Sequence, residues 1–144
     1  MTKKMYVMLS ISALVAALAV PLMAQSIRLT ANIPFEFMVG TKTLPAGEYQ
    51  VRSDSTPYLL LIQGQDHGAG ALTLTNRSEM KMSRDSAAQA TLIFNHYGNH
   101  YFLAEVRDGY NATGFVLPMS QAERELARTA SAQRYEVLAT MARR

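Results

Sequence analysis

Apolar and polar side chains alternate over long stretches of this chain. In residues 27–39 every odd position is apolar, whereas the even positions are mostly charged or polar. This period of two predicts one long, half-buried β-strand. Pro34 has no N–H to donate to a ladder, so we expect the strand to bend and to change partner at that position.

A turn is expected after this strand. Pro45 presets the backbone for the second position of a turn and Gly47 relieves its exit. Residues 48–52 are therefore predicted to return as the second strand of a hairpin. Tyr49 and Val51 share one face of that strand, which makes them candidates for the core.

Two more strands are expected before the middle of the chain. Residues 58–63, with the sequence YLLLIQ, form a short run that is apolar almost throughout. Such a run predicts a central strand that is buried on both faces. In residues 71–76, Leu72 and Leu74 alternate with threonines, which indicates another half-buried strand.

The same pattern continues after one interruption. Residues 77–89 mix charged and small side chains without a period, which indicates a surface connection. Strands are expected again at residues 90–97, 101–107 and 115–117. About seven strands without intervening helices predict an all-β fold, either a small antiparallel sandwich or a partly closed barrel.

The end of the chain has a different pattern. After Pro118, Ser120 and Glu123 stand at the spacing of a capping box, and the segment that follows is rich in alanine and arginine. We therefore expect residues 119–144 to form a C-terminal α-helical tail, with fraying beyond Ser131 because serine and threonine weaken the helix there. A modest apolar stripe predicts that the helix docks either on the β-rich domain or on a partner.

The first 24 residues have the layout of a secretory signal peptide. Two lysines precede an apolar run of 15 residues, and the segment ending at Ala24 provides a cleavage site. An uncleaved membrane anchor is the alternative, but a spanning helix needs about 20 apolar residues. We expect cleavage after Ala24, a β-rich domain over residues 25–118, a secreted or periplasmic location, and no membrane span after cleavage.

Composition narrows the classes of partner. The chain has no cysteine, so neither a disulfide nor a thiol-linked lipid is available, and packing must supply the stability. Loss of the two lysines of the signal takes the formal charge from +3 to +1. Because the mature surface is nearly neutral, no nucleic-acid partner is predicted.

Four segments together resemble a family of small exported bacterial proteins that are rich in β-structure and have no assigned function. They are IPFEFMVG at residues 33–40, LPAGEYQV at residues 44–51, YGNHYFLAEV at residues 97–106 and SQAERELA at residues 120–127. The resemblance covers most of the mature chain. It implies export and a β-rich domain in a bacterial envelope or extracellular setting, and it supplies no catalytic residues.

His96 and His100 flank a Gly-Asn pair and are the candidates for metal ligands. A two-residue turn at this pair would set His96 opposite Tyr101 and send the histidines to opposite faces. A three-residue loop, residues 97–99, would pair His96 with His100 and keep the apolar residues of both strands on one face. We favour the three-residue loop because the burial of two apolar rows outweighs the preference for one turn type.

Other chemistry finds little support in the sequence. His96 and His100 are expected to be exposed, and neither a cysteine nor a carboxylate of the same parity lies nearby in the sequence. Such histidines are more often ordinary hairpin residues than metal ligands. Nothing in the sequence places His67 beside them. No serine lies in a G-x-S-x-G elbow, and no glycine-rich segment leads from a strand into a helix, so neither a nucleophile nor a cofactor is predicted. Solvation, turn formation and dipole matching are the expected roles of Asp54, Asp66, Glu105, Asp108, Glu123 and Glu125.

These observations favour a non-enzymatic exported β-domain that acts by binding or assembly at the cell envelope. Its partners would be envelope components, or further copies that associate through a sheet edge. One alternative is a small metal-dependent hydrolase that uses His96 and His100. The other is a carrier of a small apolar ligand, enclosed by Phe35, Phe37, Tyr49, Phe94 and Phe102.

Overall fold

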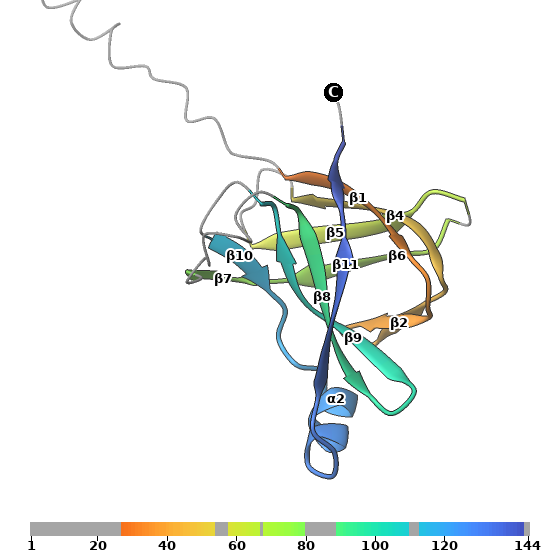
Figure 1. The fold of residues 1–144 in the computed structure, drawn as a ribbon, viewed down its shortest axis with the longest axis vertical. Coiled ribbons are helices and arrows are strands. Elements are labelled where there is room, and N and C mark those ends of the chain that lie inside the picture. Colours follow the sequence, from red (N-terminus) through yellow and green to blue (C-terminus); the bar gives the residue numbers. More distant parts are fainter. Residues whose placement is uncertain (1–26, 54–57, 67, 80–88, 110–112, 143–144) are drawn as a thin grey trace, which may run out of the picture.

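Two β-sheets pack face to face in the computed structural model, and one short helix lies at one end of them (Figure 1). The predicted all-β, sandwich-like class is confirmed, and the sheets do not close into a barrel. The predicted signal peptide, His67 and most of the connection over residues 77–89 lie outside the part of the chain that the structure describes. That part consists of residues 27–53, 58–66, 68–79, 89–109 and 113–142.

Sheet A has five strands and is antiparallel throughout. Its central strand carries the buried side chains of Tyr49 and Val51, as the alternation predicts. In spatial order the strands are β12 (Thr140–Met141), β1 (Arg28–Ile33), β4 (Gly47–Ser53), β5 (Leu59–Gly64) and β6 (Gly70–Leu74).

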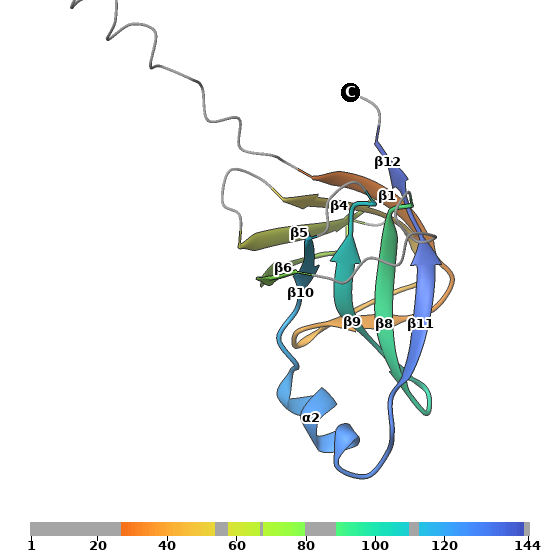
Figure 2. The ribbon, with the colours of Figure 1, turned by 60° about the vertical axis from the view of Figure 1, so that its left-hand side comes forward.

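Sheet B has seven strands, and Figure 2 shows several of them side by side. The main path runs through β11 (Gln133–Leu138), β8 (Thr91–Tyr97), β9 (His100–Arg107), β10 (Thr113–Val116) and β7 (Asn76–Glu79). A further strand, β2 (Phe37–Val39), pairs in parallel with β9 and in antiparallel with β3 (Lys42–Leu44). The strands predicted at residues 90–97, 101–107 and 115–117 thus correspond to β8, β9 and β10.

Within the described residues, four segments of chain pass from one sheet to the other at the corners of the sandwich. Strand β1 of sheet A leads through Pro34 to β2 of sheet B, so the predicted change of partner at Pro34 is confirmed. Strands β6 and β7 are separated by Thr75 alone, and β11 and β12 by Ala139 alone. The described residues contain twelve strands where the pattern suggested about seven. The strand over residues 27–39 splits at Pro34, and β3, β7, β11 and β12 form mostly where no strand was predicted. Such corners are typical of sandwiches whose strands switch sheets.

The turn at Pro45 is one of these crossings. Residues 47–53 return antiparallel to β1, as the predicted hairpin requires, but the two strands directly next to the turn do not pair with each other. Strand β3 before the turn pairs with β2, whereas β4 after it pairs with β1 and β5. The Tyr49 hydroxyl donates a hydrogen bond of 2.7 Å to the carbonyl oxygen of Pro45. A buried tyrosine that bonds to the backbone a few residues upstream also holds a corner in immunoglobulin-like sandwiches.

Strand β5 does not have the predicted central position with two buried faces. It is next to the edge of sheet A, and its side chains alternate: Leu60 and Ile62 are buried, while Leu59 and Leu61 are half-buried. The outward face of β5 has no second layer over it among the described elements. A continuous apolar run therefore does not establish burial on both faces.

The predicted helical tail is helical only over α2 (Gln121–Ala127). The Ser120 hydroxyl accepts a hydrogen bond of 3.1 Å from the N–H of Glu123, so the predicted cap is confirmed. Further along the segment predicted as a helix, residues 133–138 and 140–141 form β11 and β12 and contribute to both sheets. Tyr135 and Val137 lie opposite Phe94 and Leu92 in the ladder. This pairing outweighs the local helix propensity of the segment.

Candidate functional site

The turn between β8 and β9 has two residues, so the predicted three-residue loop is wrong. His96 lies opposite Tyr101, and Tyr97 lies opposite His100. Gly98 has a φ of 59°, whereas no residue other than glycine has a positive φ in the described chain. A positive φ at the first central position alone is the pattern of a type II′ turn, which suits the twist of a hairpin.

A β-bulge reconciles this turn with the apolar pattern. Leu92 lies opposite Val106 and Ile93 opposite Glu105, but the next pair joins Phe94 to Leu103. Ala104 is therefore an extra residue on β9. Because of this extra residue, β9 has the two-residue turn at one end and the favourable apolar pairing with β8 at the other. Simple alternation does not predict this combination.

The two candidate metal ligands consequently lie on opposite faces of the hairpin. The half-buried His96 ring stacks on Tyr101, with ring centroids 4.1 Å apart and planes at 15°. His100 is exposed beside the turn. Within the described ranges, no three His, Cys, Asp or Glu side chains gather to hold a metal ion. The structure therefore does not bring His96 and His100 together as a site.

Three carboxylates predicted to be solvated are buried instead, namely Glu105, Asp108 and Glu123. Glu105 and Glu123 lie on the outward side of sheet B. Glu105 is 6% exposed. Its two oxygens accept hydrogen bonds of 2.8 Å from Arg107 Nε and 2.5 Å from Arg134 Nη2. Glu105 lies on β9 and Arg134 lies on β11, so their contact crosses the intervening strand β8. The compensated charge indicates a structural ion-pair network.

Glu123 is another of these buried carboxylates, with 4% of its surface exposed. Its carboxylate accepts a hydrogen bond of 2.8 Å from the side-chain amide of Asn95. Burial raises the pKa of Glu123, and the hydrogen bonds from Asn95 and from the Ser120 backbone partly offset that rise. Burial, with a smaller effect of the Glu123 charge, raises the pKa of Tyr97. Glu123 is thus buried, and its hydrogen bond with Asn95 joins helix α2 to strand β8.

The aromatic residues proposed to enclose a ligand mostly contact one another. Phe37 packs edge to face against Tyr49 and Phe94, with ring centroids 5.0 and 5.5 Å apart. Phe35 stacks on Tyr101 at 3.8 Å. Phe102 lies outside this core cluster and makes an edge contact with Tyr97. Edge-to-face packing of this kind is typical of a filled core.

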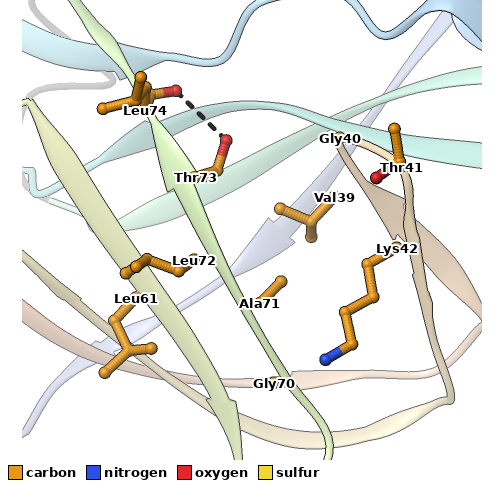
Figure 3. Close-up of a pocket in the computed structure, with 10 residues that line it drawn as sticks. All are labelled: Val39, Gly40, Thr41, Lys42, Leu61, Gly70, Ala71, Leu72, Thr73 and Leu74. Carbon is orange, nitrogen blue, oxygen red and sulfur yellow. Dashed lines mark hydrogen bonds between the residues drawn. The ribbon is translucent and has the colours of Figure 1, made fainter.

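A candidate binding feature of the described chain lies along β6. Leu72 and Leu74 are 62% and 66% exposed, while Ala71 on the alternate parity is buried. The predicted alternation is present, but the leucines face solvent. An open groove of about 650 Å³ follows the strand, with Leu61 and Leu72 on one side and Val39 and Lys42 on the other (Figure 3).

The backbone of β6 has a free edge on this groove. Among the described strands, β6 pairs only with β5. The Thr75 N–H donates to Tyr58 O at 2.8 Å and the Gly64 N–H to Ala69 O at 2.7 Å. Hydrogen-bonded pairs alternate in an antiparallel ladder, so residues 71 and 73 bond to β5. The N–H and C=O groups of residues 70, 72 and 74 therefore point away from β5.

Lys42 supplies the charge of the groove. It is exposed at the start of β3, and Figure 3 shows its side chain extended toward the Gly70 end of β6. No ion pair within the described residues includes Lys42. Sequence reasoning did not find this site because alternation does not tell which face of a strand is buried, and because β3 and β6 are distant in sequence.

Comparisons with family models, with curated proteins and with solved structures found no match, so the fold and the groove are the basis for a functional argument. Among the described residues, no helix has the length and apolar character needed to cross a membrane.

Proposed function

We propose that the mature chain is an exported, non-enzymatic domain that acts at the cell envelope by binding an extended segment of a polypeptide along β6. The N-terminal segment supports export, because its lysines, apolar run and small residues have the layout of a cleaved signal. The free edge of β6 supports strand addition, in which main-chain hydrogen bonds provide affinity and side-chain pockets provide specificity.

The observation that carries the proposal is the outward position of Leu72 and Leu74 on a strand with a free edge. Proteins usually protect such edges with charges, proline or a covering loop. Here the edge carries two exposed leucines, each of which gains about 1–2 kcal/mol when a partner covers it. The edge is therefore suited to binding.

Envelope association of the purified mature protein tests this proposal. We expect the wild type to sediment with an isolated bacterial envelope fraction. The double variant Leu72→Lys, Leu74→Lys should remain in the supernatant. Leu138→Lys is the matched control, because Leu138 is 61% exposed on the other sheet. Equal sedimentation of all three proteins would show that β6 does not bind the envelope fraction. N-terminal sequencing of the exported protein tests cleavage after Ala24.

A further inference from the structure

We infer that the segment bound along β6 is the C-terminal end of a partner chain, which runs antiparallel to β6 and places its terminal carboxylate beside Lys42. This inference rests on the proposed function and specifies its partner. It follows from the free backbone groups of β6, the apolar floor of the groove and the charge at one of its ends.

The backbone determines where the added strand bonds. Residues 70, 72 and 74 point their N–H and C=O groups toward the groove, as the ladder with β5 requires. An antiparallel segment forms its hydrogen-bonded pairs opposite these three residues. Its intervening residues then lie opposite Ala71 and Thr73, and their side chains point inward as those of Ala71 and Thr73 do.

The side chains favour a foreign segment over a second copy of β6. The inward positions of the added strand face Val39, which is buried and apolar, and Ala71. A second β6 would present only Ala71 and Thr73 at these positions, and both are too small to fill a groove of about 650 Å³. A segment with larger apolar side chains at alternate positions fills it better.

The charge determines the direction of the segment. The residues that line the groove on β6 begin at Gly70, and Lys42 extends toward that end. A strand antiparallel to β6 has its C-terminus there. Its carboxylate complements an ammonium that has no ion-pair partner among the described residues. A parallel segment would place its cationic N-terminus beside Lys42, where like charges repel.

Three peptides test the inference on the mature protein. The first is Thr-Val-Leu-Val-Leu with a fluorescent label on its N-terminal amine and a free C-terminal carboxylate, and the second is the same labelled peptide as its C-terminal amide. The third is the amide with aspartate as its last residue. Fluorescence anisotropy of labelled peptides measures affinity, and amide NMR shifts locate the contact. We expect the shifts at residues 70, 72 and 74 to exceed those at residues 71 and 73, because only the former N–H groups gain a partner.

The free acid is expected to bind about two- to fivefold more tightly than either amide, which is the range for an exposed ion pair. Lys42→Gln should remove this preference and Lys42→Arg should retain it. Arg28→Gln, which removes an exposed charge from another strand of sheet A, should leave it unchanged. Equal affinity for acid and amide, or for the aspartate amide and the acid, would overturn the inference.

Leu72→Pro separates this inference from the proposed function. Proline removes the outward N–H of residue 72 without breaking a bond to β5, so it is tolerated on the free edge. One outcome is that Leu72→Pro binds neither the acid nor the amide, while the wild type binds the two peptides equally. In that case strand addition stands and the carboxylate inference is overturned. If it binds both as the wild type does, strand addition also fails. The inference is likewise overturned if none of the three peptides binds the wild type. It is also overturned if the wild type dimerises and Leu72→Pro abolishes the dimer.

Discussion

The side-chain amide of Asn95 donates a hydrogen bond of 2.8 Å to the carboxylate of Glu123 and so joins strand β8 to helix α2. The same glutamate completes the capping box with Ser120, whose hydroxyl accepts from the Glu123 N–H. One buried residue, Glu123, therefore takes part in the helix cap through its backbone and attaches the helix to sheet B through its carboxylate.

Asn95→Ala should lower the free energy of unfolding by about 1.5–3 kcal/mol, because it removes a hydrogen bond to a buried charged group. Urea unfolding at pH 7 measures the loss. Asn32→Ala is the control, since Asn32 is an exposed asparagine on β1. A loss no larger than that of the control would show that the contact with Glu123 does not stabilise the fold.

The raised pKa of Glu123 predicts a specific pH dependence of stability. The folded state binds this proton more tightly than the unfolded state, so the contribution is fully present below the unfolded pKa, near 4.5. It is lost as pH rises through the folded pKa, at up to about 1.4 kcal/mol per pH unit. Relative to Glu123→Gln, the wild type should thus lose stability over this window. Parallel urea curves across the window would contradict the assignment.

The two arginines of Glu105 should contribute non-additively. Arg134→Ala should cost no more than about 1 kcal/mol, because its side chain is 57% exposed and Arg107 still pairs with Glu105. The double variant Arg107→Ala, Arg134→Ala leaves a buried carboxylate unpaired and should cost about 3 kcal/mol. Denaturant titrations of the double-mutant cycle measure the coupling. Strict additivity would indicate that the two contacts are independent.

Gly98→Ala should cost about 1–2 kcal/mol, because Gly98 has a φ of 59° and side chains are disfavoured there. Asn99→Ala, one residue further along the same turn, should change stability by less than about 0.5 kcal/mol. Thermal unfolding compares the two variants. Nuclear Overhauser contacts between His96 and Tyr101 test the register, and contacts between His96 and His100 across the hairpin would contradict it.

The histidines should differ in their contribution to stability and should not act as a metal pair. His96→Ala should cost about 0.5–1.5 kcal/mol through the lost stacking on Tyr101, whereas His100→Ala should lie within about 0.5 kcal/mol of the wild type. Zinc should leave the Tm of all three proteins unchanged. A zinc-dependent rise in Tm that both substitutions abolish would restore the metal hypothesis.

Much of the local structure was predictable. The alternation of residues 27–39 predicts β1 and β2 with their break at Pro34, and the spacing of Ser120 and Glu123 predicts the start of α2. The candidate site was less accessible to such reasoning. Leu72 and Leu74 were visible as an apolar row, but their exposure and the proximity of Lys42 depend on the packing of β6 beside the β2–β3 turn.

The sequence by itself determined the all-β class and the helix cap, because these depend on side-chain period and on backbone preferences within a few residues. The tertiary structure alone decided three further features. It turned the leucines of β6 outward, inserted Ala104 as a bulge and made residues 133–138 a strand. Each of these depends on ladder pairing and burial between distant segments, where a period of two is compatible with either face and a one-residue shift exchanges them.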